Sequence, residues 1–233
     1  MTLIIASVRP HDIVLTADGR SETIVKGVVT GVDDHYQKLF PIPDHPVVIA
    51  HMGENLLGGK PVKAFLAKFI AGLNTGNFTI QEIADQLRAY AHPAIRARLN
   101  ALGKPRFGVN LWVAGFGSHD EGPSVIETFW KYSDESLLTT ERRFSPFCVV
   151  PGGDGQFEIS KVDWHEIQGK SVDEVRAYHH RIMEQALHAK TDNNSVGGRI
   201  HELVITPASW RWTEPPDGTP VEKATTTQSA TGS

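Results

Sequence analysis

Residues 1–8 of the chain read Met1-Thr2-Leu3-Ile4-Ile5-Ala6-Ser7-Val8. The run from Leu3 is short and apolar, which favours a strand that begins directly behind the initiator methionine. Removal of Met1 would leave Thr2 with a hydroxyl and a free α-amine on adjacent carbons. Such an amine has a pKa of roughly 7.7–8.0 and is partly neutral near pH 7, so it can serve as base for the hydroxyl as nucleophile. On these residues alone, the alternative is that the chain simply begins with Met-Thr and a strand, and that Thr2 has no catalytic role.

Composition narrows the class of protein. The chain has 233 residues and a net charge of −4, which argues against nucleic acid or an anionic membrane as main partner. No apolar run approaches the roughly 20 residues that span a bilayer, and the first residues lack a secretory signal pattern. The single cysteine, Cys148, fits a reducing compartment. We therefore expect a soluble cytoplasmic protein, with Cys148 as a buried strand thiol rather than a catalytic one.

Periodicity and turn residues predict the elements. Expected strands lie at 3–8, 12–17, 46–53, 107–116, 124–130, 147–150, 199–205 and 209–213, with an irregular hairpin over 23–32. An expected helix lies at 54–73, where the Gly-Gly-Lys-Pro run at 58–61 could interrupt it. A second begins at the capping box at 79–82 and should kink or break at Pro93, and a third runs from the capping box at 171–174 to Ala189.

Strands and helices occur in blocks rather than in strict alternation, which points to an α+β fold with antiparallel sheets. A four-layer αββα arrangement, two sheets packed together with helices on both outer faces, accommodates this order. We expect one domain over 1–213. The segment 214–233 is rich in Pro, Thr and Ser and has little to bury, so it is expected to be a disordered tail.

Three polar features stand out beside Thr2. Asp18 closes the second expected strand, Lys38 precedes the strand at 46–53, and Asp192 and Ser195 form an Asp-x-x-Ser pattern after the last long helix. Each has a plain alternative. Asp18 could be only a turn residue, Lys38 a solvated surface charge, and 192–195 a loop that ends a helix.

Taken together, these features resemble the proteasome-type N-terminal nucleophile hydrolases, namely β-type subunits and the bacterial heat-shock peptidase that works with a ring unfoldase. The resemblance covers nearly all of residues 2–206. It is carried by Thr2, the turn Thr16-Ala17-Asp18-Gly19-Arg20, the segment Gln37-Lys38-Leu39, the run Ile49-Ala50-His51-Met52-Gly53, and Asp192-x-x-Ser195. The family's αββα sandwich agrees with the block order.

The resemblance implies a role for each matched residue. Thr2 resembles the nucleophile that forms an acyl-enzyme with a peptide carbonyl. Lys38 resembles the lysine whose charge favours the alkoxide, and Asp18 the carboxylate that orients this lysine. The backbone amide of Gly53 resembles the oxyanion donor.

The resemblance also implies how substrate and amine are held. Asp192 and Ser195 resemble the pair that positions the N-terminal amine. The segments that flank a substrate strand and its first specificity pocket correspond to Arg20, Ser21, Glu22, His51 and Met52. In that family a peptide binds by adding a strand.

Several positions depart from the family pattern. Pro151 stands where the family has a Ser that helps to hold the amine, Glu54 replaces a small residue after Gly53, and the segment between Asp18 and Lys38 is about four residues longer than in the heat-shock form. These departures suggest a divergent bacterial branch.

The expected function is a threonine endopeptidase that works as a subunit of a homo-oligomeric, stacked ring on peptide or unfolded-protein substrates, with any ATPase unfoldase on a separate chain. No cofactor is expected, because no nucleotide-binding glycine loop is present and the eleven histidines form no recognised metal-ligand spacing. A catalytically silent structural subunit and a small-molecule amidase of the same fold remain as alternatives.

Overall fold

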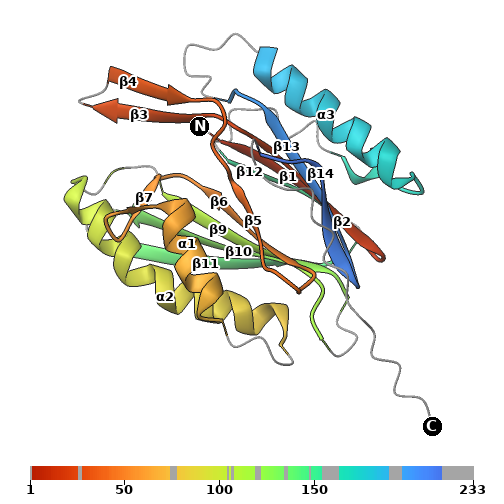
Figure 1. Ribbon diagram of the computed structural model, residues 1–233, viewed down its shortest axis with the longest axis horizontal. Helices are drawn as coiled ribbons and strands as arrows, with labels where there is room; N and C mark the ends of the chain where they lie inside the picture. Colours follow the sequence, from red (N-terminus) through yellow and green to blue (C-terminus); the bar gives the residue numbers. More distant parts are fainter. Residues whose placement is uncertain are drawn as a thin grey trace.

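Among the residues it describes, the structure, a computed structural model, places ten strands in two large sheets and four in two hairpins, with three α-helices around them (Figure 1). It describes residues 2–25, 28–73, 78–103, 105, 108–118, 122–133, 136–146, 148–153, 163–188 and 196–216.

The first sheet has the strand order β12-β1-β2-β13-β14, with every neighbouring pair antiparallel. Its strands are β1 (Leu3–Arg9), β2 (Asp12–Asp18), β12 (Cys148–Gly153), β13 (Ile200–Thr206) and β14 (Ser209–Glu214). The expected strands at 3–8, 12–17 and 209–213 are thereby confirmed, and so are those at 147–150 and 199–205, except that residue 147 lies outside the described residues and β13 begins one residue after Arg199. The register of β1 with β2 pairs Ile4 with Ala17, so the start of β1 and the end of β2 lie side by side at one end of the sheet.

The second sheet has the order β11-β10-β9-β6-β5 and is also antiparallel. Its strands are β5 (Leu39–Pro41), β6 (Val47–Met52), β9 (Val109–Gly115), β10 (Ser124–Ser133) and β11 (Ser136–Phe144). The sequence did not predict β11. Most of its side chains are exposed, so it lacks the alternation that marks a half-buried strand.

Two short hairpins complete the strands. The irregular hairpin expected over 23–32 is β3 (Ser21–Val25) paired with β4 (Val28–Asp33). The other, β7 (Leu56–Leu57) with β8 (Lys60–Pro61), occupies the first part of the expected helix 54–73, which is therefore wrong there. The reason lies in the turn, because Gly58 and Gly59 both adopt positive φ angles and helix α1 (Val62–Ala71) begins only after them.

Helix α2 (Ile80–Ala101) begins at the expected capping box, in which Thr79 and Glu82 each accept the other's backbone N–H. Of the kink or break expected at Pro93, the break is wrong, because the helix continues through this residue. Pro93 lacks the N–H that would reach the carbonyl four residues back. The helix nevertheless buries Leu87, Ala91, Ile95 and Leu99 on either side of Pro93, and this packing outweighs the missing bond.

The last helix, α3 (Val172–His188), follows a short 3₁₀ turn, η2 (Trp164–Glu166). Its capping box is confirmed, since Ser171 Oγ accepts the Glu174 N–H at 3.3 Å and Glu174 accepts the Ser171 N–H at 2.8 Å. No helix within the described ranges is both long and apolar enough to cross a membrane.

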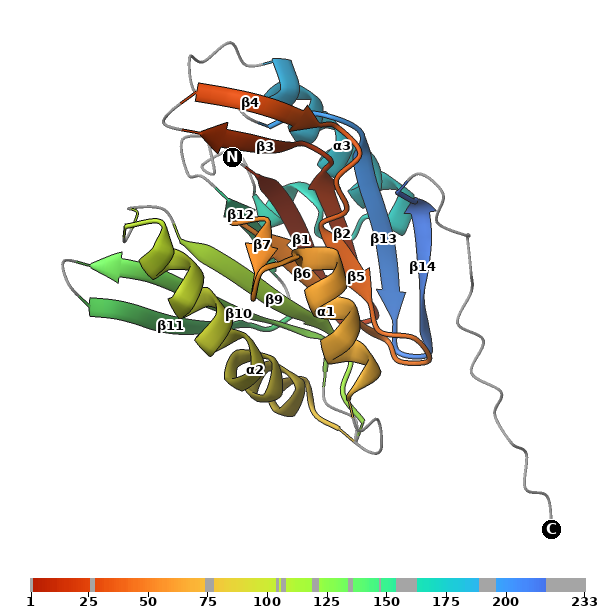
Figure 2. The same cartoon turned by 60° about the vertical axis from the view of Figure 1, so that its left-hand side comes forward.

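Apolar faces hold these elements together. Ile4, Ala6 and Val8 of β1 join residues of β6 and β9 in one buried cluster, whereas Leu3 and Ile5 pack on the opposite side of the sheet with residues of α3. Helices α1 and α2 pack on the second sheet (Figures 1 and 2). The fold is thus α+β with antiparallel sheets, as the block order predicted.

The two large sheets approach each other closely at Gly152. A Cβ added there would lie 2.2 Å from the ring of Trp112 and 2.9 Å from the sulfur of Met52, so only glycine fits. This glycine lies in β12 beside Pro151, and the register pairs Pro151 with Ile5 and Gly152 with Ile4.

The single-domain boundary at 213 stays a prediction. Strand β14 ends at Glu214, next to that boundary, and residues 217–233 of the expected tail lie outside the described part of the chain.

Candidate functional site

The candidate nucleophile lies at the start of β1, beside a buried carboxylate. Thr2 is partly exposed, and the backbone N–H of the next residue, Leu3, donates to Asp18 Oδ1 at 2.8 Å. The antiparallel register of β1 and β2 brings these residues together, because Ile4 pairs with Ala17 and the carboxylate of the following residue reaches back to Leu3. Asp18 is thus fixed to the backbone one residue from Thr2.

Lys38 meets the same carboxylate oxygen. Its Nζ lies 2.6 Å from Asp18 Oδ1, and the two side chains are 2% and 0% exposed. Lys38 stands directly before β5, and its carbonyl accepts the backbone N–H of His51 at 3.0 Å. The alternatives of a solvated surface lysine and a plain turn aspartate are therefore excluded.

Lys38 and Asp18 form an ion pair that is shielded from water. Burial lowers the pKa of Lys38 from its ordinary value, while the charge and hydrogen bond of Asp18 act in the opposite direction. Asp18 Oδ2 also accepts the backbone N–H of Gly197 at 3.2 Å. Asp18 thus accepts three hydrogen bonds, one from Lys38 and two from backbone N–H groups.

Gly53 directly follows β6 in a conformation that favours glycine. Its φ is +104°, and a Cβ added there would lie 2.4 Å from the carbonyl oxygen of Gly108. Gly53 is exposed, and its backbone N–H donates to no residue in the described part of the chain. An exposed amide without an acceptor is able to receive an oxyanion.

Glu54, which follows, turns its carboxylate toward the backbone N–H groups of Asn55 and Leu56 and toward Arg98 of α2 at 3.3 Å.

Two of the expected substrate-binding residues lie in a buried position. His51 is 1% exposed and Met52 is 4% exposed. Burial lowers the pKa of His51 to about 3, so the ring is neutral, and its Nε2–H donates to the Glu54 carbonyl at 2.9 Å. His51 Nδ1 remains a buried acceptor with no partner among the described residues.

The other three lie at the start of the β3–β4 hairpin. Arg20 forms an ion pair with Asp34, with Nε 2.6 Å from Oδ1, and Ser21 Oγ accepts a hydrogen bond from Asn55 Nδ2. Glu22 is partly exposed on β3. The Ser21–Asn55 contact joins the hairpin to the segment that follows Gly53.

Asp192 and Ser195 lie outside the described residues. The described chain resumes at Val196, and Gly197 is a site residue that the sequence reading missed. Only the doubled glycine at 197–198 hinted that the backbone there passes close to another segment.

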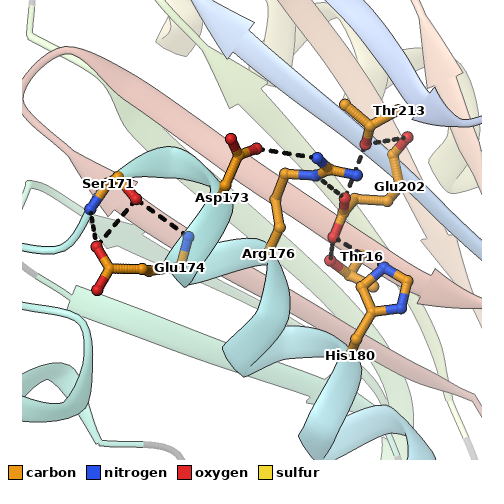
Figure 3. Close-up of polar contacts among 8 residues, drawn as sticks. All are labelled: Thr16, Ser171, Asp173, Glu174, Arg176, His180, Glu202 and Thr213. Atoms are coloured by element: carbon orange, nitrogen blue, oxygen red, sulfur yellow. Dashed lines mark hydrogen bonds and ion pairs between the residues drawn. The ribbon is translucent and has the colours of Figure 1, made fainter.

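A second polar cluster lies between α3 and the first sheet. Glu202 of β13 is fully buried and accepts from Arg176, from Thr213 Oγ1 at 2.7 Å and from Thr16 Oγ1 at 3.1 Å, with His180 Nε2 at 3.4 Å (Figure 3). The pKa of Glu202 lies at about 2, because these partners outweigh the effect of burial. The cluster therefore fixes α3 to β2, β13 and β14.

His179 extends this cluster inward. Because Thr16 donates its proton to Glu202, its oxygen accepts from His179 Nδ1–H at 2.8 Å, which leaves Nε2 to accept from Ser7 Oγ–H at 2.6 Å. Ser7 and His179 are both 0% exposed, so no substrate reaches this serine. The arrangement is a buried anchor for α3 rather than a second nucleophile site.

We expect His179 to make stability depend on pH. Burial lowers its pKa to about 3 in the folded chain, against roughly 6.5 when unfolded. Between these values the unfolded state binds more protons, so stability falls as pH falls, by about 2 kcal/mol from this residue at pH 5. The loss in free energy of unfolding between pH 7 and pH 5, measured with urea, should be smaller by that amount in His179→Gln than in the wild type. An equal loss in both proteins would contradict this assignment.

No group of three or more His, Cys, Asp or Glu side chains within the described ranges could hold a metal ion. Cys148 is in a strand, as expected, and is only partly buried. Burial raises the pKa of its thiol to about 11, and the thiol donates to the Ser145 carbonyl at 3.0 Å.

Comparison with known proteins finds similarity at the level of the fold. No family model and no curated protein matches the chain. Among solved structures, Anbu (ancestral beta-subunit) from Yersinia bercovieri aligns with a TM-score of 0.51 at 14% identity, over 88% of this chain and 81% of that one. Anbu from Hyphomicrobium sp. strain MC1 aligns with a TM-score of 0.52 at 14% identity, over 97% of this chain and 88% of that one.

These findings correct the family assignment drawn from the motifs. The chain resembles Anbu proteins in fold, and its assignment to the proteasome β subunits and the heat-shock peptidase is not supported by any family match. The physical reason is that the motifs amount to a few short segments. Turns such as Ala17-Asp18-Gly19 recur in many folds, and at 14% identity the rest of the chain adds no family signal.

Proposed function

We propose that the chain is a threonine-type peptidase that cleaves amide bonds through the N-terminal Thr2 exposed when Met1 is removed. One observation carries the proposal. A buried carboxylate, Asp18, holds on one oxygen both the Lys38 ammonium, at 2.6 Å, and the backbone N–H of the residue after Thr2, at 2.8 Å. Lys38 and the residue directly after the candidate nucleophile are thereby bound to the same oxygen atom.

The reaction follows from these groups. The Thr2 α-amine takes the hydroxyl proton as Oγ1 bonds to the substrate carbonyl carbon, and the Gly53 N–H stabilises the oxyanion. The C–N bond then breaks, the leaving amine takes the proton, and an ester to Thr2 remains. Water adds to that ester, the acid departs, and the hydroxyl is restored. Lys38 stabilises the developing alkoxide by its charge, and Asp18 orients Lys38.

The proposal also gives roles to the remaining site residues, on the basis of their positions in the sequence. Asp192 and Ser195 would hold the Thr2 amine, a role made more demanding by Pro151 in place of a hydroxyl. Arg20, Ser21, Glu22, His51 and Met52 would flank an extended substrate. Peptide added as a strand beside β3 would gain most of its affinity from backbone hydrogen bonds.

The proposal extends to architecture and assembly. The packing of α1 and α2 on one sheet and of α3 on the other supports a four-layer αββα sandwich in a single domain. A homo-oligomeric ring in the cytoplasm, with sites facing an enclosed chamber and any unfoldase on a separate chain, would restrict substrates to unfolded protein. The fold similarity to a protein described as an ancestral beta-subunit supports this part of the proposal.

The decisive test combines intact mass with activity. The purified protein should lack one methionine and should gain one adduct with a peptide epoxyketone, a reagent that captures both the hydroxyl and the amine. Thr2→Ala should form no adduct and should lose all measurable hydrolysis of fluorogenic peptides while unfolding at the same urea concentration. Retention of Met1, or full activity in Thr2→Ala, would refute the proposal.

The same experiment separates the two rivals. A catalytically silent subunit would form no adduct even with Met1 removed, a result that Pro151 makes worth testing. A small-molecule amidase would lose activity in Thr2→Ala but would cleave simple acylated amines and spare casein and extended peptides.

A further inference from the structure

Asp18 owes part of its orientation to a segment far away in the sequence. Lys38 and Leu3 both bind Oδ1, and Oδ2 accepts only the backbone N–H of Gly197 among the described residues. Gly197 therefore helps to orient the Asp18 carboxylate. Groups that hold residues 196–199 in place thus also support the geometry between Asp18 and Lys38.

The guanidinium of Arg20 lies directly against Gly197. A Cβ added to Gly197 would lie 2.3 Å from both Cζ and Nε of Arg20, so the arginine occupies the space that a side chain would need. Asp34 fixes the arginine in turn, with Oδ1 2.6 Å from Nε and Oδ2 3.3 Å from Nη2. Two contacts in a fork restrict the guanidinium more strongly than one.

Asp34 also touches the segment through its backbone. Its carbonyl accepts the Arg199 N–H at 3.0 Å, and a Cβ on Gly198 would lie 2.4 Å from that carbonyl oxygen. Gly198 adopts a φ of +73°, which lets the chain turn at this contact. Asp34 thus holds the same segment twice, by its main chain and through Arg20.

We propose that Asp34 is a positioning residue. It holds residues 196–199 in place through Arg20 and so orients Asp18 toward Lys38; the contacts among Asp34, Arg20 and Gly197 are called the clasp. The catalytic consequence rests on the proposed function. The contact with Gly197 gives Arg20 a supporting role in the site, in addition to its proposed place beside the substrate. Because the Arg20 and Asp34 side chains are 31% and 44% exposed, the ion pair adds little to global stability. Variants at Asp34 should therefore fold.

The test uses the full chain and a matched control. Asp34→Asn removes the charge at the clasp, and Asp85→Asn removes it from a comparable exposed pair on α2, where Arg88 lies 2.6 Å from Asp85. Hydrogen exchange by mass spectrometry should be about tenfold faster in the peptide over 196–206 of Asp34→Asn and unchanged in Asp85→Asn. For peptide hydrolysis, kcat should fall by about tenfold to a hundredfold with KM unchanged, and Asp34→Glu should recover part of it.

Unchanged exchange over 196–206 in Asp34→Asn would overturn the clasp, as would faster exchange with an unchanged kcat. A rise in KM with kcat intact would also overturn it, because Arg20 would then act on the substrate alone. Failure of the proposed function is recognised separately, as Thr2→Ala with full activity, and in that case the exchange result alone decides whether Asp34 holds the segment.

Discussion

Lys38→Met should reduce peptide hydrolysis by at least about a thousandfold, because it removes the only cation on the Asp18 oxygen next to Thr2 within the described residues, and triad-like groups act as a unit. It should also destabilise the fold by about 3–5 kcal/mol, since Asp18 would be left as an uncompensated buried charge. Steady-state kinetics and urea unfolding measure the two effects.

A double variant separates chemistry from folding. In Asp18→Asn with Lys38→Met both charges are gone, so most of the lost stability should return, while activity should remain at the level of Lys38→Met. As a control, Lys170→Met breaks an exposed contact with Glu174 and should change neither quantity appreciably. Activity near that of the wild type in the double variant would show that the pair is structural only.

Local patterns allowed much of the fold to be predicted. The hairpin of β1 and β2 and the capping boxes at Thr79 and Ser171 follow from signals within a few residues. Two errors arose where packing outweighs a local signal or where a local signal is missing. Pro93 lies within α2 because the helix buries a continuous apolar face on the second sheet, and β11 was missed because its exposed side chains carry no alternation.

Local sequence signals were also insufficient to predict the contacts of the candidate site. The sequence singled out Asp18 and Lys38 but left open whether Asp18 was only a turn residue and Lys38 only a surface charge, because burial depends on segments brought in from elsewhere. The contact of Gly197 with Asp18 joins residues 179 positions apart, and the pairing of Arg20 with Asp34 depends on the path of the hairpin between them. Neither contact has a local signature in the chain.

Gly53→Ala should lower kcat by about a hundredfold to a thousandfold, the usual cost of losing one oxyanion donor. The added Cβ would lie 2.4 Å from the Gly108 carbonyl oxygen, and since this oxygen belongs to the backbone next to β9, Gly53 itself must shift and carry its N–H away from the carbonyl of the substrate. A positive φ also penalises alanine by about 1–2 kcal/mol in stability.

Gly59→Ala is the matched control for that substitution. Gly59 has a φ of +72° in the turn between β7 and β8, six residues further along, and an added Cβ would meet nothing within 4 Å. It should show the backbone penalty in urea unfolding but keep its kcat. The difference in kcat between the two variants therefore measures displacement of the Gly53 amide alone. Equal kcat values in Gly53→Ala and Gly59→Ala would remove Gly53 from the oxyanion site.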